Sequence, residues 1–298
     1  MFEEFHDTSL IKFIERFNTS DKCKEYIAHY KWRNGFTCPK CGHTHYWRKK
    51  DDPYTKVCKA CRYAESVTAH TLFHKVKFGL PKAFYILFEM SMTTKSCSSP
   101  VLARKYEINQ KTAWLFMSKV RKAMSSNGQF PLEGECEVDE ILIGGSQSGK
   151  RGRGAVKKKK AAIVIEKTAK GGIKRAYAMK IDNFSSDQLK KIFDCHISKD
   201  ATINTDKWRG YIPLNGQWNI LQVKSDPVSN FKTIHRFVQQ LKSWIRGIYH
   251  HVSDRYLQGY LDEFCFRMNR HANKPALFDK LIQRMVERPP APLYLLAS

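Results

Sequence analysis

The chain of 298 residues lacks any run of about 18 apolar residues, the length that a membrane-spanning helix needs. Its N-terminus lacks the basic, apolar and small-residue succession of a secretory signal peptide. No basic amphipathic helix or lipidation motif stands out, which argues against a membrane surface as the partner. The sequence therefore predicts a cytoplasmic protein that acts away from membranes.

Acidic residues are scarce, and this shortage points to the partner. The chain has 28 Asp and Glu against 52 Lys and Arg, a formal net charge of +24 that is spread along its length. A polyanion is the simplest partner for such a surface, and nucleic acid is the most common one. With 42% hydrophobic residues the chain should be globular, with two or three domains.

Nine cysteines in a cytoplasmic chain favour metal binding or free thiols over disulfides. Four of them form a C-x2-C-x16-C-x2-C array, comprising Cys38, Cys41, Cys58 and Cys61. Two such pairs on tight turns converge as four thiolates around a tetrahedral zinc ion. The protein fills all four positions, so we expect a structural zinc, with the nearby His43 and His45 outside the ligand set. The alternative is four unrelated buried cysteines.

Residues 80–124 carry helical periodicity. Ser98-Ser99-Pro100 caps and opens one helix, Glu107–Asn109 forms a turn, and a second helix follows over Gln110–Lys122. This is a helix-turn-helix pattern, with a plain helical hairpin as the alternative. The candidates for DNA contact are Asn109, Gln110, Lys111 and Thr112. The expected core residues are Ala113, Leu115, Phe116 and Val120.

From Gly134 onward the pattern changes to strands. The first strand ends at the pair Gly144-Gly145. We expect four further strands, over 161–166, 173–181, 201–205 and 218–223. One helix should follow a capping box at Ser185–Gln188, a second should span 232–247, and further helices should span 254–288. Three strands, a helix, two strands and a helix make the ribonuclease H-like order. In that fold the first and fourth strands are neighbours near the centre of the sheet.

Alternation along the first strand places Glu135, Glu137 and Asp139 on one face. An acid among β-formers is costly unless something pairs with it, and a metal ion would be such a partner. The alternative is an exposed edge strand with solvated acids. Asp206, 67 residues after Asp139, ends the fourth strand and would meet it. Two adjacent carboxylates repel unless a divalent cation neutralises them, and two such ions support phosphodiester chemistry.

A third ligand should come from the helix after the fifth strand, but no Asp or Glu lies between Asp226 and Asp254. We therefore expect His235 to take that position, although a single histidine on a helix often has a structural role. Lys242 lies seven residues later, on the same helix face. An imidazole suits Mn²⁺ better than Mg²⁺ and can act as a base.

The segment 149–160 holds seven basic residues and three glycines. We expect a mobile loop that binds DNA phosphates, so that the affinity for DNA falls strongly as the salt concentration rises. A nuclear-localisation signal is the alternative. The candidate DNA-binding residues are Lys150, Arg151, Arg153, Lys157, Lys158, Lys159 and Lys160.

Together these motifs resemble bacterial insertion-sequence transposases related to the eukaryotic Merlin elements, the ISXO2-like branch of the DDE transposase superfamily. The likeness covers nearly the whole chain. It is carried by Cys38–Gly42, Cys58–Cys61, Ala103–Met124, Val138–Glu140 with Gly144-Gly145, Thr205–Tyr211, Tyr249–Ser253, Tyr256–Gln258, Tyr260–Phe264 and Phe266–Asn269.

The resemblance implies two catalytic aspartates, a third residue that is Glu or Asn in many members, and a lysine seven residues after it. These positions fall on Asp139, Asp206, His235 and Lys242, so the histidine departs from the family's pattern. Glu263 is the alternative third acid, but its spacing matches the family's ending motif and favours a structural role.

The resemblance further implies a DNA transposase that binds the terminal inverted repeats of its element, cleaves DNA with Mg²⁺ or Mn²⁺, and transfers the 3′ ends to target DNA. We expect a multidomain α+β chain: helices and a four-cysteine zinc ribbon over 1–70, a helix-turn-helix region over 71–128, and a ribonuclease H-like catalytic domain over 129–298. Two element ends must be joined in one event, which implies a homodimer or larger assembly on double-stranded DNA. We expect the protein to lie in the bacterial cytoplasm, in association with the nucleoid. The rival functions are a transcription regulator without catalysis and a junction or repair nuclease of the same fold.

Overall fold

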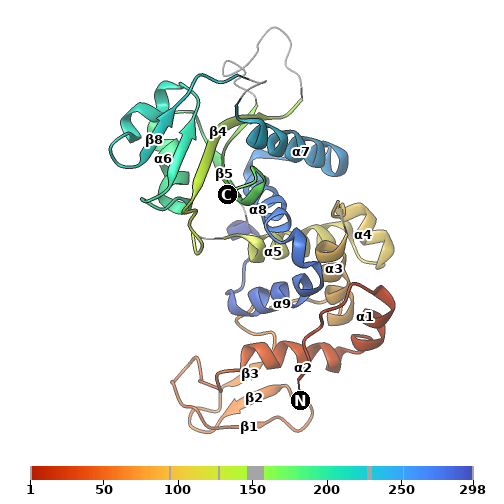
Figure 1. Cartoon of the computed structure of the whole chain (residues 1–298). Helices are drawn as coiled ribbons and strands as arrows, with labels where there is room; N and C mark the ends of the chain where they lie inside the picture. The colour runs from red at the N-terminus through yellow and green to blue at the C-terminus, as the bar shows by residue number, and fades with distance from the viewer. Residues whose placement is uncertain are drawn as a thin grey trace. The chain divides into compact units, whose positions relative to one another are not determined.

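The computed structural model describes residues 2–93, 95–126, 128–145, 158–226, 230–250 and 252–296. Contacts divide the chain into two compact units (Figure 1). The first comprises the residues up to Met124 together with Ala272–Leu296, and the second comprises Ser125–His271. No helix among the described residues is long and apolar enough to cross a membrane.

The first unit is built mainly of helices. They are α1 (Leu10–Arg16), α2 (Ser20–Lys31), α3 (Leu80–Met92), α4 (Ser99–Lys105), α5 (Gln110–Met124) and α9 (Leu277–Glu287). Short 3₁₀ segments η4 (His271–Ala276) and η5 (Leu293–Leu296) flank α9. The predicted helix-turn-helix segments thus form α4 and α5, which pack on each other. Leu115, expected in the core, is only half-buried, whereas the other three expected core residues are buried.

Helix α9 packs on α2, α3 and α5 through an aromatic core. The ring of Phe278, fully buried, lies 4.7 Å from the ring of Phe13 and 5.6 Å from that of Phe84. The sequence placed this helix with the catalytic segment; in the structure it completes the N-terminal unit. The three-part division by function stays a prediction.

The helical spacing of Phe5, Leu10, Phe13, Ile14 and Phe17 predicts one short helix near the N-terminus, and the structure shows that this helix starts later than Phe5. Helix α1 begins at Leu10, because the Ser9 hydroxyl accepts a hydrogen bond from the Lys12 N–H and caps it. Phe5 nevertheless reaches the aromatic core from the preceding extended segment.

A small antiparallel sheet, ordered β1-β2-β3, carries the cysteine array. Its strands are β1 (Tyr46–Arg48), β2 (Thr55–Cys58) and β3 (Ala64–Ser66). Lys31, at the end of α2, holds this sheet in place: its Nζ lies 2.8 Å from a Glu65 carboxylate oxygen and also donates to the carbonyls of Ser66 and Ala69. Both charged side chains are buried, so the pair fixes the sheet against α2.

The second unit contains a five-stranded sheet ordered β6-β5-β4-β7-β8. Its strands are β4 (Glu135–Ile143), β5 (Lys159–Lys167), β6 (Ile173–Ile181), β7 (Thr202–Thr205) and β8 (Asn219–Gln222). Pairing is antiparallel between β4, β5 and β6, and parallel between β4, β7 and β8. The prediction that the first and fourth strands of this segment are neighbours is therefore confirmed.

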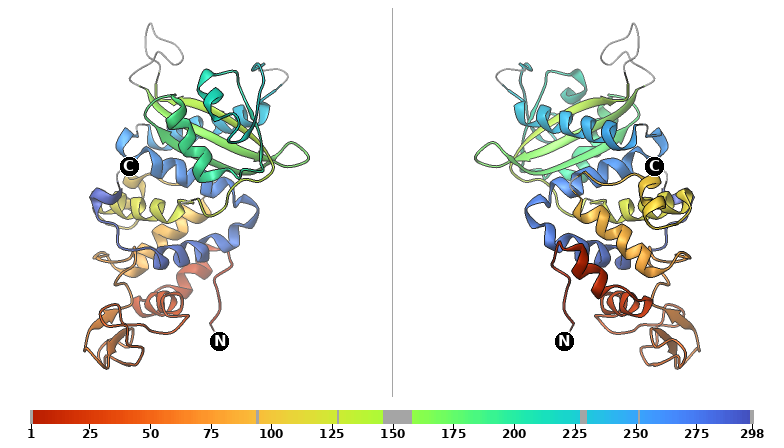
Figure 2. Two further views of the ribbon diagram at one scale, coloured as in Figure 1. Left: turned by 90° about the vertical axis from the view of Figure 1, so that its left-hand side faces the viewer. Right: turned by 90° about the vertical axis from the view of Figure 1, so that its right-hand side faces the viewer.

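Helices cover both faces of this sheet (Figures 1 and 2). On one face lies α6 (Ser186–His196), which packs on β5 and β6 and shares a core with Cys136 and Val138 of β4. On the other lie α7 (Lys232–Tyr249), which packs on β4, and α8 (Leu257–Met268), which packs on β6; both share a core with Ile141 and Ile143. The 3₁₀ segments η2 (Arg209–Leu214) and η3 (Asp254–Tyr256) connect these elements. The odd-numbered residues of β4 thus face α7 and α8, the face on which the sequence placed its acids.

Two local predictions in this unit need correction. Ser185 precedes α6 but makes no side-chain capping bond, and the Gln188 amide oxygen instead accepts from the Asp182 N–H at 3.4 Å. Lys159 and Lys160, expected in a mobile loop, belong to β5 and are paired with Ile143 and Leu142. Strand pairing extends past the apolar core here because the lysine stems can lie along the sheet while their ammonium groups reach water.

Candidate active site and zinc centre

Strand register brings Asp139 and Asp206 together. The last register pair between β4 and β7 is Val138 with Thr205; Asp139 follows Val138 within β4, and Asp206 directly follows the end of β7. Neighbouring strands lie about 4.8 Å apart, and equivalent positions in a parallel pair point to the same face. Both aspartates are half-buried.

The chain beyond β7 holds Asp206 from several sides. The Trp208 N–H donates to Asp206 Oδ1 at 2.9 Å, and the Gln222 amide donates to the carbonyls of both Asp206 and Trp208. The Trp208 indole N–H donates to the Phe184 carbonyl at 3.0 Å. A Cβ at Gly210 would lie 2.6 Å from that indole nitrogen, so only glycine fits there. The loop is therefore fixed, and one oxygen of Asp206 is oriented by the backbone.

A buried hydrogen bond ties this loop back to β4 beside Asp139. Tyr211 is fully buried, and its hydroxyl donates to Glu140 Oε2 at 2.6 Å. Burial raises the pKa of Tyr211, and the carboxylates of Glu140, Asp139 and Asp206 raise it further. Both aspartates thus lie near this phenol. The pairing of Tyr211 with Glu140 was not predicted, since nothing in the sequence near either residue indicates a contact 71 positions away.

Helix α7 supplies the other two predicted residues. Its buried stripe comprises Ile234, Phe237, Val238, Leu241 and Ile245, and His235 and Lys242 flank it, both half-buried. Burial lowers the pKa of Lys242, while the Asp139 carboxylate opposes this shift and the Lys158 ammonium adds to it. Lys242 therefore lies close enough to Asp139 for their charges to interact.

The three predicted metal ligands, Asp139, Asp206 and His235, do not form one compact cluster of ligand atoms. Over the described ranges, two groups of three or more ligand side chains come within 4.8 Å of one another: the four ribbon cysteines, and Glu4, His6 and Asp279. The hydroxyls of Tyr26 and Tyr30 donate to Asp279, so that carboxylate already serves packing. Two carboxylates on one sheet face, with an imidazole on the helix that covers that face, are nonetheless a donor set that suits Mg²⁺ or Mn²⁺.

Glu263 occupies a different environment from the paired aspartates. It is fully buried on α8, and the hydroxyl of Tyr249, the last residue of α7, donates to its two oxygens at 3.3 and 3.5 Å. A buried carboxylate that is hydrogen-bonded between two packed helices fits a structural role.

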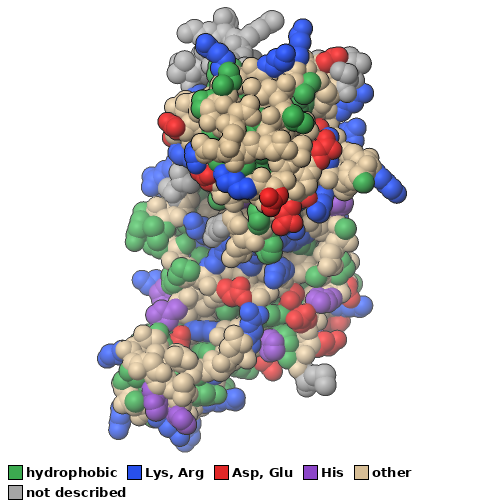
Figure 3. All heavy atoms as spheres, turned by 60° about the vertical axis from the view of Figure 1, so that its left-hand side comes forward, with side chains coloured by type: hydrophobic (Ala, Val, Ile, Leu, Met, Phe, Trp, Pro, Cys, Tyr) green, Lys and Arg blue, Asp and Glu red, His purple; other side chains and the backbone are tan. Residues whose placement is uncertain are grey.

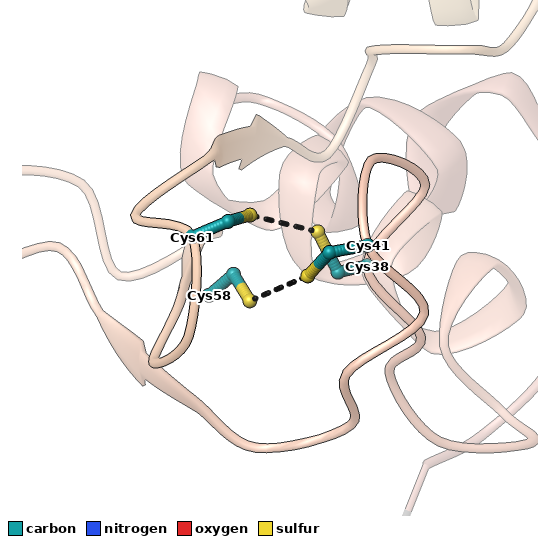
Figure 4. Close-up of side chains that lie close together, drawn as sticks. All are labelled: Cys38, Cys41, Cys58 and Cys61. Atoms are coloured by element: carbon teal, nitrogen blue, oxygen red, sulfur yellow. Dashed lines mark hydrogen bonds between the residues drawn. The ribbon is translucent and has the colours of Figure 1, made fainter.

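The four ribbon cysteines converge from two similar turns (Figure 4). The Cys38 carbonyl accepts from the Gly42 N–H at 2.9 Å, and the Cys58 carbonyl accepts from the Arg62 N–H at 3.1 Å; Gly42 and Arg62 both have positive φ. The sulfurs of Cys38 and Cys61 are 3.5 Å apart, and those of Cys41 and Cys58 are 3.6 Å apart. A zinc–sulfur bond of about 2.3 Å gives tetrahedron edges of about 3.8 Å, so the cluster fits zinc.

We expect the full-length chain, purified under reducing conditions, to contain about one zinc per molecule by elemental analysis. Replacing Cys58 with Ser should remove that zinc, because three thiolates and a hydroxyl bind it far more weakly. Replacing Cys195, which lies outside the cluster, should leave the zinc content unchanged. Zinc-free native protein would contradict the assignment.

The predicted DNA-contacting residues on α5 are partly accessible. Gln110 and Lys111 are exposed and Thr112 is half-buried. Asn109 is exposed too, but its side chain caps α5 by accepting from the Lys111 N–H at 2.8 Å. Figure 3 shows Lys and Arg side chains spread over the drawn face, with acidic groups between them. The candidates Lys150, Arg151, Arg153 and Lys157 lie outside the described residues.

Comparisons with known proteins identify a family for both parts of the chain. Residues 131–269 match the ISXO2-like transposase domain, and residues 18–64 match the transposase zinc-ribbon domain. A protein in the transposable element ISH50 of Halobacterium salinarum is 21% identical over 217 residues, which is 68% of this chain and 72% of the relative.

Two solved structures also show a distant similarity. A pre-cleavage Mos1 transpososome has a TM-score of 0.24 at 9% identity, covering 63% of this chain and 74% of that one. A Mos1 transposase paired-end complex with the left transposon end has a TM-score of 0.22 at 10% identity, covering 69% and 79%. These scores are too low to define the fold.

The two domain matches, one over the ribbon and one over the sheet with its helices, define a DNA transposase. The chain belongs to the ISXO2-like transposases of insertion sequences.

Proposed function

We propose that this transposase binds the terminal inverted repeats of its own element, cleaves the DNA there, and joins the freed 3′ ends to target DNA. The observation that supports the proposal most is the register of β4 and β7, in which Asp139 and Asp206 directly follow the last paired residues, Val138 and Thr205. The sheet order, with three antiparallel strands followed by two parallel ones, supports a ribonuclease H-like catalytic domain.

Asp139, Asp206 and His235 would hold the divalent ions, and the bound ions would activate the attacking oxygen and stabilise the leaving oxygen. Lys242, on the same helix as His235 and within electrostatic reach of Asp139, contacts a phosphate beside the scissile bond. Its partial burial makes its position more defined than that of a surface lysine. Trp208 and Tyr211 keep the Asp206 loop in place through the hydrogen bonds described above.

DNA recognition falls to other parts of the chain. Helices α4 and α5 act as a helix-turn-helix, with Gln110, Lys111 and Thr112 toward DNA, and the zinc ribbon assists them. The basic segment 149–160 contacts flanking or target phosphates. Two ends joined in one event require a homodimer or larger assembly on the DNA.

The test uses the whole chain, duplexes that carry the DNA sequences flanking its gene on either side, and Mg²⁺ or Mn²⁺. We expect release of a 3′-hydroxyl at the repeat end and its transfer to a second duplex. A transcription regulator would bind these duplexes without cutting them. A junction or repair nuclease would cut branched DNA regardless of the repeats. Either of these results would overturn the proposal.

Phosphate contacts should make binding to element ends strongly salt-dependent. Replacing Lys157–Lys160 with glutamine should reduce the slope of log K against log salt by up to about 3.6, since each lost phosphate contact contributes about 0.9. The measurement is a fluorescence-anisotropy titration at several salt concentrations. A control that removes the same charge elsewhere, at Lys170, Lys190, Lys191 and Lys199, should change the slope much less. An unchanged slope in the first variant would mean that these lysines do not contact DNA.

A further inference from the structure

Helix α7, which carries His235 and Lys242, starts without a capping side chain of its own. The residue at its N-cap position is Phe231, which has φ +56° and an apolar side chain that is buried. A non-glycine residue in this left-handed conformation is strained. The first N–H groups of any helix lack intrahelical partners and must be satisfied by other groups.

A glutamate from the neighbouring sheet supplies the missing cap. Glu137 Oε2 accepts a hydrogen bond from the N–H of Ile234 at 3.2 Å. Ile234 is the third residue of α7, whose N–H is the group that a capping Ser or Asp normally binds. The negative charge also suits the positive end of the helix dipole.

The same carboxylate is fixed from its other side. Glu137 Oε1 lies 3.3 Å from the Lys167 ammonium, which also pairs with Glu135 at 2.5 Å. Glu137 is only 5% exposed, so its position is set by these contacts rather than by solvent. One of the three acids that the sequence placed on this strand face therefore caps α7, and a second, Glu135, shares the Lys167 ammonium with it.

We infer that Glu137 is a positioning residue, which fixes the start of α7 on β4 and thereby places His235 and Lys242 relative to Asp139. Glu137 lies two residues before Asp139 on the same strand face, and its hydrogen-bond partner Ile234 directly precedes His235. One side chain thus links the strand of the first aspartate to the helix of the third ligand. This inference rests on the proposed function for its catalytic consequence.

Loss of this link should loosen the first turn of α7 without unfolding the unit. The buried stripe of α7 still packs on the sheet, and Lys167 keeps Glu135 as its partner. Displacement of a reacting group by about 1 Å can lower a rate by about 100-fold. A frayed first turn would therefore impair catalysis more than stability.

The experiment compares Glu137→Ala and Glu137→Gln in the full-length chain with a matched pair at Glu166. Glu166 is 4% exposed, accepts from the Gly134 N–H at 3.2 Å and pairs with Lys174 at 2.7 Å, and both of these partners lie outside α7. Two readouts are taken: amide hydrogen exchange over residues 232–236, and the cleavage rate constant at saturating end DNA.

We expect Glu137→Ala to speed exchange over 232–236 and to lower the cleavage rate constant about 10- to 100-fold, with end-binding affinity within about twofold of native. Glu137→Gln keeps an acceptor oxygen for the Ile234 N–H and should restore the rate to within about threefold. Neither Glu166 variant should change exchange over 232–236.

Native exchange and a native rate in Glu137→Ala would overturn the inference. It would also be overturned by equal losses in both alanine variants, since that pattern reports general destabilisation. If the native chain itself does not cleave end DNA, the proposed function fails. The exchange comparison then still decides whether Glu137 holds the start of α7.

Discussion

Replacing Asp139 or Asp206 with alanine should abolish cleavage and joining and leave binding to element ends unchanged. Each change removes a carboxylate from the pair that strand register brings together. A bound ion contributes several kcal/mol of transition-state stabilisation, so its loss should cost about 1,000-fold or more in rate. The measurement is a cleavage and strand-transfer assay beside an electrophoretic binding assay.

The control is Asp194→Ala on the surface of α6. Its carboxylate pairs with Lys190 at 2.8 Å in a solvent-exposed position, where such a pair contributes little. This variant should cleave like the native chain. Full activity in either Asp139→Ala or Asp206→Ala would contradict the proposed site.

His235→Ala should also be severely impaired, because no carboxylate on α7 can replace the imidazole. His235→Glu should retain activity in Mg²⁺, since an oxygen donor at the same position suits a hard cation. Mn²⁺ should stimulate the native enzyme more than the glutamate variant, because imidazole favours the softer ion. Cleavage rates of the three proteins in each metal test this expectation.

The comparison variant is Glu263→Gln, which keeps the size and hydrogen-bonding ability of the buried side chain. We expect it to retain cleavage, with any loss appearing as lower thermal stability. If His235→Ala cleaves like the native protein while the folded Glu263→Gln is inactive, the third active-site residue is Glu263.

The sheet was predictable because its signals are local. Alternating β-formers, glycine turns and helical spacing marked all five strands and the helices between them within a few residues, as for Ile173–Ile181. The neighbouring positions of Asp139 and Asp206 followed from strand order alone. The cysteine spacing likewise predicted the cluster that the structure brings together.

The supporting contacts were not predictable, because each joins residues that are distant in sequence. Glu137 meets Ile234 across 97 positions, and Tyr211 meets Glu140 across 71. Neither the alternation of apolar residues along the strands nor their spacing along the helices predicts which residue a buried acid will contact. The start of α1 was missed for another reason, since the apolar spacing of the phenylalanines continued past the true cap at Ser9.

The place of α9 in the N-terminal unit has a consequence for the order in which the protein matures on the ribosome. Tyr26 and Tyr30 of α2 donate to Asp279, and Phe278 fills the centre of the aromatic cluster, yet both partners are translated after the whole of 125–271. The sheet unit can therefore emerge and fold first, while the helices around Phe13 and Phe84 wait with apolar surface uncovered. The nascent chain therefore exposes aggregation-prone surface until its last helix appears. A nonsense codon anywhere before Leu277 removes a part of the N-terminal core.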